Sequence, residues 1–390
     1  MTSLTSIEQN LNPFPIYKKL REQQPVFYDS ERFSWNIFNY SDVERVLSDY
    51  EVFSSEFHRN PQAATNYPLA ASIISTDPPR HRQLRALATQ AFTPRSVDAL
   101  APRIQAIVDE YLDKVMPLGR MDVIQDLGYP LPTIVIAELL GIPTEDRQKF
   151  KIWSDWIVQN TANTEEINPE IMHTNHVLEM STYFIEMIQR RQDHPGEDLI
   201  SRLMQASIDQ ERLSMSELLG FCTLLLIAGN ETTTNLIGNA LLSFCEHPQL
   251  WQRLRQNPEL APQAIEEVLR YRSPVQAMFR YNKSDIQLDG QTIPAGSRLI
   301  AWIGSANHDE TQFEAPEEFD IDRNPNKHIA FGHGVHYCLG APLARLEARI
   351  ALNEMLKRFS KLTQAAYPVP KRLPSLIVYG LDSLPITFTN

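Results

Sequence analysis

The chain has 390 residues, of which 43% are hydrophobic and 22% charged, a balance typical of a folded globular protein. Its net charge of −12, from 36 basic and 48 acidic side chains, argues against a nucleic-acid partner. The N-terminus lacks a basic segment followed by an apolar one, and the longest apolar run, residues 218–229, is too short to span a bilayer, so we expect neither a signal peptide nor a membrane anchor. Because 3 cysteines give no disulfide framework, a cytoplasmic protein is predicted.

Helical patterns dominate the N-terminal half. Asp77 precedes two prolines and a run of helix-forming residues, so we expect it to cap a helix that contains residues 80–85. Thr93 is followed by proline in the same way and predicts a helix that runs towards Tyr111. Residues 131–140 form an apolar pattern that predicts another helix, closed by the glycine that follows.

The longest helical pattern begins at Ser214. Ser214 and Glu217 have the spacing of a capping box, and the pattern continues until Pro248 ends it. About 33 residues at ~1.5 Å each span roughly 50 Å, enough to cross a whole domain. A shorter helix is expected over residues 262–271.

Strand patterns are few and short. They cover residues 26–28 and 35–38, which we expect to pair, and residues 286–288, 298–303, 376–379 and 385–388. No repeat or low-complexity linker divides the chain. We therefore predict a mainly α fold with a smaller β part and a long central helix, in a single domain over residues 1–390.

Cys338 lies in a glycine- and histidine-rich segment, residues 331–340, here named the cysteine loop, directly before a strong helical pattern. A helix N-terminus carries partial positive charge, so we expect a lowered thiol pKa and a thiolate ligand. Gly332, Gly334 and Gly340 would let the backbone turn sharply and approach a flat ligand. A thiolate bound to haem iron favours cleavage of the O–O bond.

Two other interpretations of the cysteine loop stay open on the residues alone. A buried structural cysteine is the commoner fate of a single cysteine. Alternatively, His333, His336 and Cys338 could supply three ligands to zinc. Zinc would need a fourth ligand or a water, and it would leave the glycine spacing unexplained.

The cysteine loop resembles the haem-binding loop of the cytochrome P450 superfamily. The family pattern Phe-x-x-Gly-x-x-x-Cys-x-Gly is matched by Phe331, Gly334, Cys338 and Gly340. The resemblance extends over nearly the whole chain, with the motifs in family order. It implies the cytochrome P450 fold, haem b as the cofactor, and Cys338 as the axial ligand of the iron, with Phe331, Gly332 and Gly340 around it.

The long helix carries the sequence Ala-Gly-Asn-Glu-Thr-Thr from Ala228, which resembles the family's oxygen-activation motif. The resemblance implies that Ala228 and Gly229 leave space for dioxygen and that Glu231 and Thr232 manage protons. Thr232 can also bond the carbonyl four residues back and bend the helix. The alternative is a solvated helix face, and residues 233–235 are expected to pack or face solvent.

Glu267 and Arg270 stand three residues apart, where side chains meet on one helix face. Such a pair is common by chance, but its distance from Cys338 resembles the family's signature pair. Arg323 resembles the third member. The resemblance implies a buried structural triad that holds the cysteine loop in place.

Haem carries two propionates, so cationic partners are needed. His81 and Arg85 lie on one helix face and resemble the family's propionate-binding pair, while Arg280 and His336 match positions with the same duty. Each alone could be an ordinary surface charge. Together they are predicted to bind the propionates.

Substrate contacts are predicted in segments 57–76, 224–228, 275–279 and 377–381, which are mostly apolar. The candidate pocket residues are Ala228, Val275, Met278, Phe279 and Val378. They could equally be core residues. An apolar pocket would suit a hydrophobic substrate.

The resemblance implies a monooxygenase that inserts one atom of dioxygen into a hydrophobic small molecule, with a fatty acid, steroid or isoprenoid expected. NAD(P)H would supply electrons through a reductase and a separate ferredoxin or flavodoxin, and the protein is expected to be a monomer. Two alternatives are a peroxide-driven peroxygenase and a haem-binding protein without turnover. The helix after Cys338 carries a predicted docking face, made of Arg345, Arg349, Lys357 and Arg358 beside Glu347 and Glu354.

Overall fold

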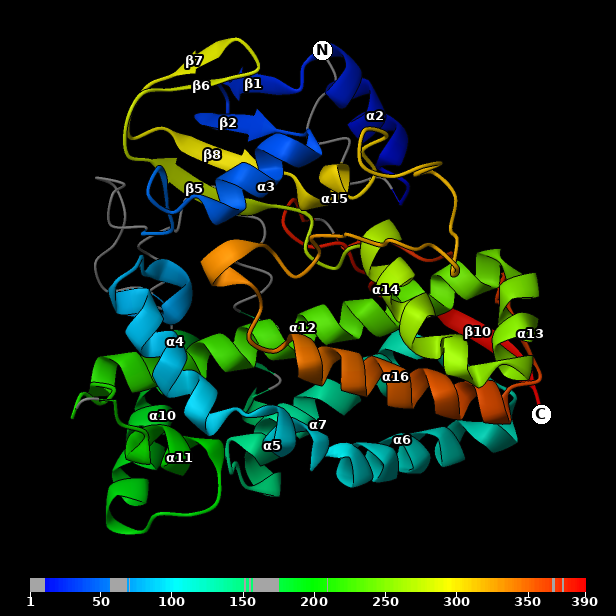
Figure 1. The fold of residues 1–390 in the computed structure, drawn as a ribbon. Coiled ribbons are helices and arrows are strands. Elements are labelled where there is room, and N and C mark those ends of the chain that lie inside the picture. Colours follow the sequence, from blue (N-terminus) through cyan, green and yellow to red (C-terminus); the bar gives the residue numbers. More distant parts are fainter. Residues whose placement is uncertain are drawn as a thin grey trace.

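The computed structural model describes residues 11–56, 69, 71–150, 152–153, 156, 175–208, 210–366, 369–373 and 375–390. Most long helices gather on one side of the molecule, and a five-stranded sheet lies on the other (Figure 1). None of the described helices combines the length and the apolar character needed to cross a membrane.

The helices have the following bounds: α2 (Phe14–Gln23), α3 (Tyr40–Ser48), α4 (Arg80–Ala91), α5 (Pro94–Asp98), α6 (Ala101–Val115), α7 (Pro130–Leu139), α10 (Asn175–Asp193), α11 (Leu199–Gln205), α12 (Met215–Glu246), α13 (Pro248–Gln256), α14 (Ala261–Tyr271), α15 (Ile303–Ala306) and α16 (Ala341–Arg358). Short helical turns that matter below are η2 (Ile73–Ser75) and η7 (Gly334–His336).

The strands have the following bounds: β1 (Val26–Asp29), β2 (Ser34–Ile37), β3 (Phe53–Ser54), β4 (Arg120–Asp122), β5 (Met278–Asn282), β6 (Ile286–Leu288), β7 (Gln291–Ile293), β8 (Arg298–Ala301), β9 (Lys361–Gln364) and β10 (Pro385–Thr389).

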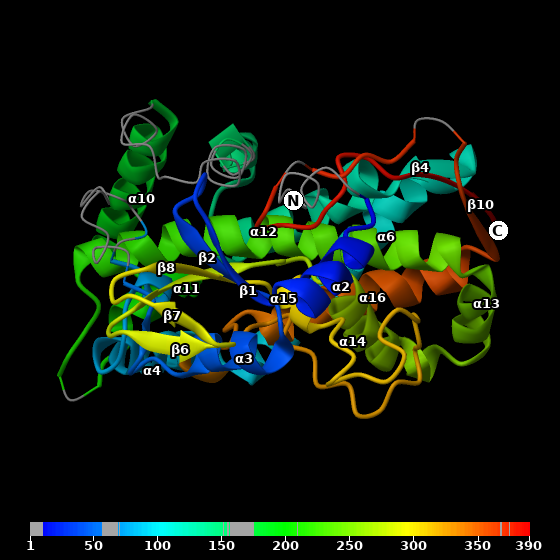
Figure 2. The ribbon, with the colours of Figure 1, turned by 90° about the horizontal axis from the view of Figure 1, so that it is seen from above.

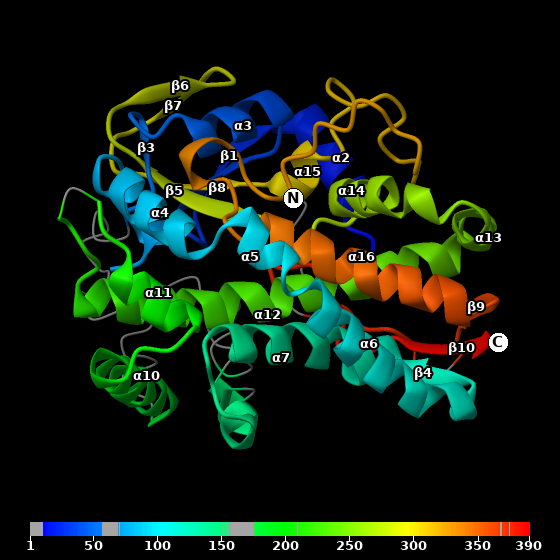
Figure 3. The ribbon, with the colours of Figure 1, turned by 60° about the horizontal axis from the view of Figure 1, so that its bottom comes forward.

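Helix α12 is the central element, as predicted. Its 32 residues begin after a complete capping box, in which Ser214 accepts from the backbone N–H of Glu217 and the Glu217 carboxylate accepts from that of Ser214. The helix crosses the molecule and packs between α7 and α16 (Figure 3). The largest hydrophobic core joins the inner faces of α6, α7, α12, α14 and α16. The long helix is thereby buried along most of its length.

The five-stranded sheet has the order β1-β2-β8-β5-β3. The expected pair β1 and β2 is antiparallel, with Val26 opposite Ile37, and β8 joins β2 in parallel. The two-stranded ribbon β6-β7 projects beside this sheet, while β4, β10 and β9 form a separate sheet near the C-terminus (Figure 2). The prediction of a strand over residues 376–379 is wrong, because the structure has only an isolated bridge there, between Val275 and Val378.

Two helix predictions need correction. Asp77 does not cap α4; its carboxylate instead accepts hydrogen bonds from Ser54 Oγ and from the backbone of Ser55, which ties the start of α4 to β3. Thr93 does cap a helix, but the helix ends at Asp98 and a second begins at Ala101. Pro102 explains the break, because proline has no N–H to continue the first helix.

Candidate active site

A cavity lies where α12 passes the cysteine loop, bounded by α4, η2 and β5. It holds about 1560 Å³ free of protein atoms, part of which opens to solvent. In Figure 1 the loop is the orange segment before α16, below α3. The predicted site residues that line the cavity are His81, Arg85, Ala228, Gly229, Thr232, Val275, Met278, Arg280, Phe331, Gly332, His336, Cys338 and Gly340.

Three of the predicted catalytic and pocket residues are not part of this lining. Phe279 follows Met278 on strand β5, where successive side chains point to opposite faces, and it packs on a separate core cluster instead. Val378 is buried and pairs with Val275 in the isolated bridge. Glu231 is half-buried on α12, beside Thr232. Phe279 and Val378 are therefore corrected from pocket residues to residues that support the pocket wall.

The predicted pocket segment 57–76 is described only in part. Residues 57–68 and 70 lie outside the described residues. Ile73 and Ile74 of η2 line the cavity with Val275 and Met278, so the described part of this segment contributes to an apolar wall.

Two glycines of the cysteine loop do what their type predicts. Gly332 has φ +75 and Gly334 has φ +69, a backbone conformation that residues with a side chain rarely adopt. A Cβ on Gly334 would also lie 2.7 Å from Ser48 Cα, so the loop packs directly on the end of α3. Gly340, however, has φ −81, and its role is different from the predicted sharp turn. A Cβ there would lie 3.9 Å from the Cys338 sulfur, an ordinary contact distance.

Cys338 is anchored by its backbone, whose N–H donates to the Phe331 carbonyl at 2.9 Å. Burial raises the pKa of the Cys338 thiol, and hydrogen bonds from the backbone N–H groups of Gly340 and Ala341 and the charge of Arg85 only partly offset it. The predicted lowering of this pKa is therefore wrong for the protein alone. The donors at the start of α16 are in place, but burial has the larger effect.

Arg345 fastens the cysteine loop to α14. Its guanidinium lies 4.5 Å from the centre of the Phe331 ring and pairs with Glu266, with both N–O distances 2.7 Å. It also donates to the Tyr337 hydroxyl at 3.2 Å, and His328 approaches Glu266 at 3.0 Å. Arg345 thus belongs to the support of the loop, because its charge is already neutralised by Glu266.

The predicted docking face is correspondingly smaller than expected. Arg358 pairs with Asp109 at 2.6 Å and with Glu354 at 2.9 Å, and Lys357 also pairs with Glu354. Arg349 is exposed. Glu347 does not lie on this face at all, because its side chain is buried.

The α12 motif has the local geometry expected of it at Thr232, whose hydroxyl donates to the Ala228 carbonyl at 2.6 Å. Gly229 has a second role that the sequence does not reveal. A Cβ at this position would lie 2.7 Å from Ile136 Cδ1 of α7, so glycine lets the two helices approach. Thr234 packs as predicted, donating to the Gly128 carbonyl at 2.9 Å.

Four cationic or ionisable side chains meet at one edge of the cavity. The rings of His81 and His336 are 4.2 Å apart, and neither nitrogen of the buried His81 ring has a hydrogen-bond partner in the part of the chain that the structure describes. Arg280 is 4% exposed and donates to the backbone carbonyl of Phe279, with no ion pair among the described residues. Burial and the neighbouring arginines lower the pKa of His81 to about 4 and that of His336 to about 3. Asp77 is the carboxylate whose charge acts on His81, His336 and Arg280, but it already pairs with Lys283 and accepts hydrogen bonds from Ser54 and Ser55. The cluster, with Arg85 beside it, is therefore short of negative charge, and the two carboxylates of haem fit that need.

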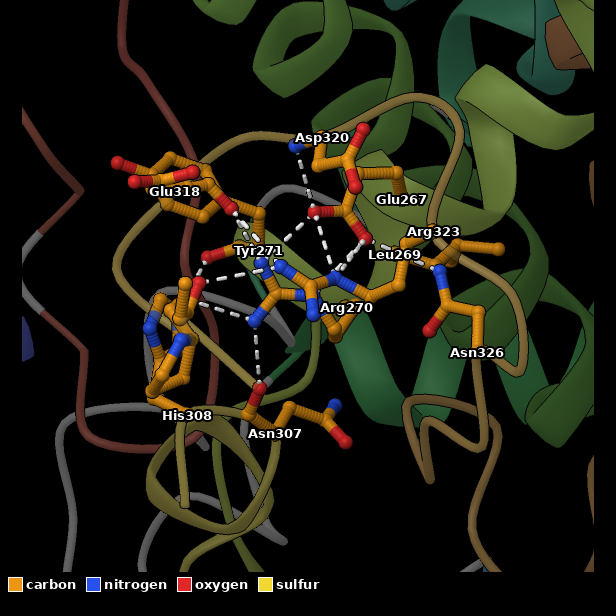
Figure 4. A network of polar contacts seen from close by, with 12 residues as sticks. Glu267, Leu269, Arg270, Tyr271, Asn307, His308, Glu318, Asp320, Arg323 and Asn326 are labelled. Carbon is orange, nitrogen blue, oxygen red and sulfur yellow. Dashed lines mark hydrogen bonds and ion pairs between the residues drawn. The ribbon is translucent and has the colours of Figure 1, made fainter. Parts of the chain in front are cut away.

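The predicted triad is complete and larger than predicted (Figure 4). Arg270 makes two bonds to the Glu267 carboxylate, at 2.9 and 2.7 Å, and Arg323 approaches it at 3.3 Å. Asn326 and the backbone N–H of Asp320 also donate to it, each at 3.0 Å. Arg270 further donates to the backbone carbonyls of residues 307, 316 and 318. The cluster therefore ties α14 to the irregular segment that leads into the cysteine loop.

Sequence reasoning missed two polar residues of the cavity. Thr233 lines it, although the sequence suggested packing or solvent contact. Glu347 of α16 lines it too. A signal existed for the latter, because Leu343 and Ala351 lie four residues before and after Glu347 and are buried on the same stripe of the helix.

The zinc alternative finds no support in the geometry. Within the part of the chain that the structure describes, no three His, Cys, Asp or Glu side chains are placed to hold a metal ion together. His333 points towards Glu44, with 3.8 Å between the Nε2 and carboxylate atoms, while His336 bonds Ser55.

Comparisons with known proteins agree with this site. The family model for cytochrome P450 matches residues 3–387. Cytochrome P450 109 of Bacillus spizizenii is 43% identical over 394 residues, covering 100% of this chain and 95% of the relative. The crystal structure of CYP109E1 from Bacillus megaterium in complex with testosterone is 43% identical, with a TM-score of 0.87, covering 97% of this chain and 100% of the other. The structure of P450BioI with acyl carrier protein bearing hexadec-9Z-enoic acid is 36% identical, with a TM-score of 0.90, covering 99% of this chain and 100% of the other.

The chain therefore belongs to the cytochrome P450 family. It has the fold of that family and is a monooxygenase that uses haem b, with electrons that come from NAD(P)H through redox partners. It is similar to bacterial members of the family, including Cytochrome P450 109 and CYP109E1.

Proposed function

We propose that the protein hydroxylates a neutral, hydrophobic small molecule, for which a steroid or an isoprenoid is a better candidate than a free fatty acid. The observation that carries the proposal is the single cavity that brings Cys338, the cationic cluster and an apolar wall together. Haem b held by a thiolate supplies dioxygen activation and O–O cleavage when bound. The remaining roles, which are to bind the haem and the substrate and to deliver protons, belong to residues of this chain.

Cys338 is the proposed axial ligand. Its backbone bond to Phe331 fixes the residue, and the N–H groups of Gly340 and Ala341 reach the sulfur and would stabilise negative charge on it. His81, Arg85, Arg280 and His336 are the proposed partners of the propionates, which would satisfy the unpaired nitrogens of His81 and the buried charge of Arg280.

Glu231 and Thr232 are the proposed residues that manage protons. The Thr232 hydroxyl donates to the Ala228 carbonyl of its own helix, beside the cavity. The hydroxyl oxygen keeps acceptor capacity for a water, and the neighbouring Glu231 carboxyl can exchange a proton with that water. In the peroxygenase alternative, Glu231 and Thr232 would have no function in the reaction.

The polarity of the cavity argues for a neutral substrate. Among the described residues of its lining, the cations are those of the proposed propionate cluster and His333, which faces Glu44. Much of the rest of the lining is apolar and includes Ile73, Ile74, Ile136, Phe221, Leu224, Leu225, Val275 and Met278. A free fatty acid would need a cation for its carboxylate, whereas a steroid needs mainly apolar contact. CYP109E1, similar to this chain, has been solved with testosterone.

The electron donor is proposed to be an acidic ferredoxin or flavodoxin with its reductase. Arg349 is the exposed cation left on the predicted docking face, because Arg345, Lys357 and Arg358 are paired. Arg349→Gln should slow reduction of the haem at low ionic strength and less so at high ionic strength. An unchanged rate at low ionic strength would exclude this residue from the docking face.

The first test is the carbon monoxide difference spectrum of the reduced wild type and of Cys338→Ser. We expect a strongly red-shifted Soret band that is lost in the variant. An unshifted band in both proteins would overturn the assignment of Cys338. The affinities of candidate substrates are then ranked from the spin-state shift of the haem, and testosterone is compared with hexadecenoic acid. Tighter binding of the acid would overturn the preference for a neutral substrate.

A further inference from the structure

Ile136 is a cavity residue that comes from a helix behind α12. Helix α12 lies between α7, which carries Ile136, and α16, which follows the cysteine loop (Figure 3). Among the described residues of α7, Ile136 is the one that lines the cavity. It is 3% exposed, and none of the roles proposed above uses its side chain.

The missing side chain at Gly229 explains how Ile136 reaches the cavity. A Cβ on Gly229 would lie 2.7 Å from Ile136 Cδ1 and 2.9 Å from its Cγ1, closer than packed atoms approach. The end of the Ile136 side chain therefore occupies the place that a side chain at position 229 would take. Because both residues line the cavity, Ile136 closes the gap that Gly229 leaves in the wall formed by α12.

Hydrogen bonds fasten α7 to α12 next to this contact. The Thr133 hydroxyl, one turn before Ile136, lies 2.8 Å from Asn230 Oδ1 in a buried hydrogen bond. Thr234, one turn after Asn230, donates to the carbonyl of Gly128, which precedes α7. Asn230 and Thr234 are buried, so water does not compete for these bonds. Ile136 is therefore held in place by its helix and not only by its own packing.

The closed gap lies within the α12 motif. Ala228 and Thr232 line the cavity before and after Gly229, and the Thr232 hydroxyl donates to the Ala228 carbonyl. The end of Ile136 is a methyl group, which adds an apolar boundary to this polar part of the wall. Close packing at this boundary leaves little room for an added methylene group.

We propose that Ile136 is a specificity-determining residue that limits the space beside Ala228 and Thr232 to molecules of the size of dioxygen. The inference rests on the proposed function, in which dioxygen is used beside these two residues. The substrate fills the wider, apolar part of the cavity, and Ile136 keeps its groups out of the space next to the motif. Dioxygen thereby keeps its place when the substrate is bound.

The experiment measures the size of this space with alkyl isocyanides, which bind to reduced haem iron as carbon monoxide does but carry an alkyl tail. The affinities of methyl, ethyl and n-propyl isocyanide are measured for the haem-loaded wild type, Ile136→Val and Ile136→Ala. Ile136→Val removes Cδ1, the atom nearest to the Cβ position of Gly229, and Ile136→Ala removes the side chain beyond Cβ.

Ile124→Val and Ile124→Ala are matched controls. A Cβ on Gly238 of α12 would lie 2.6 Å from Ile124 Cδ1, so Ile124 makes the same kind of contact with the same helix. It is buried as well, but it is not among the described residues that line the cavity. The controls therefore loosen the packing of α12 without opening the cavity wall.

The ratio of the affinities for ethyl and methyl isocyanide reports the room for one methylene group. We expect Ile136→Val to increase this ratio about fourfold over wild type, the change that corresponds to one buried methylene group. Ile136→Ala should show the same gain and extend it to n-propyl isocyanide. Both Ile124 variants should keep the ratios of wild type.

Two outcomes would overturn the proposal. One is a set of affinity ratios in the Ile136 variants equal to those of wild type. The other is an equal gain in the Ile124 variants, since loosened packing of α12 would then be the cause. If Ile136→Ala fails to take up haem, Ile136→Val decides the question because it makes the smaller change. A wild type that lacks the red-shifted carbon monoxide band refutes the proposed function itself, and this result is distinct because it is seen without any variant or isocyanide.

Discussion

The double role of Gly229 leads to a quantitative prediction. Replacing Gly229 by Ala improves the helix propensity of α12 by about 1 kcal/mol. The new Cβ would lie 2.7 Å from Ile136 Cδ1 and 2.9 Å from Cγ1, an overlap whose relief costs about 1–3 kcal/mol. We therefore expect Gly229→Ala to lower the free energy of unfolding by about 0–2 kcal/mol. Ile136→Ala alone should lower it by about 2–5 kcal/mol because Ile136 is 3% exposed.

The double variant separates packing from space for dioxygen. Without the Ile136 side chain the added methyl group fits, so Gly229→Ala/Ile136→Ala should be about 1–3 kcal/mol more stable than the sum of the single changes predicts. Denaturant unfolding of the four proteins measures this coupling. Ile124→Ala is a matched control, since Ile124 faces Gly238 of the same helix rather than Gly229. Additive effects of Gly229 and Ile136 within about 0.5 kcal/mol would refute the packing role.

Further predictions concern the supports of the cysteine loop. Glu267→Gln leaves two arginines of its cluster without a carboxylate and should lower the free energy of unfolding by about 3–5 kcal/mol; a loss below about 1 kcal/mol in urea unfolding would contradict the structural role. Gly334→Ala should abolish haem uptake, measured by absorbance, because the residue has a left-handed backbone and its new Cβ would collide with α3. Gly296→Ala is the control: the residue has φ +77 but open space around it, so haem uptake should stay intact. Burial would raise the pKa of Glu266, but hydrogen bonds from Arg345 outweigh it and lower the pKa to about 2. Wild type should therefore have a higher free energy of unfolding than Glu266→Gln, and the difference should be largest above pH 4.5 and shrink as the pH falls towards 2. A difference that does not depend on pH would contradict this prediction.

Local signals in the sequence predicted local structure well. The capping box at Ser214 and the long helix that follows are correct because a cap and its helix involve only neighbouring residues. The contacts of Glu267 and Arg270 are also correct, since spacing on one helix fixes them. The prediction of a single domain over residues 1–390 stays a prediction.

What the sequence could not predict depends on the partner of each element. Met278 and Phe279 are both apolar, and only the placement of β5 decides that the first faces the cavity. Asp77 resembles a helix cap, yet the nearby strand β3 offers it better donors. Glu347 was assigned to a charged surface because Arg345 and Arg349 lie two residues away on either side, whereas in the structure its side chain is buried and α12 packs on α16.

Two charged clusters of the molecule differ in a way that indicates their roles. Around Glu267 each arginine meets a carboxylate or a backbone carbonyl, so the protein completes this cluster by itself and gains a rigid support. Around Arg280 and His81, neither ring nitrogen of His81 has a hydrogen-bond partner among the described residues, Arg280 donates to one backbone carbonyl, and the charges of Arg85 and Arg280 lower the pKa of His81. A folded chain tolerates that arrangement where an external anion completes it, since binding to the folded state alone then adds stability. The first cluster is therefore part of the scaffold, and the second is where we expect haem binding and protein stability to be linked.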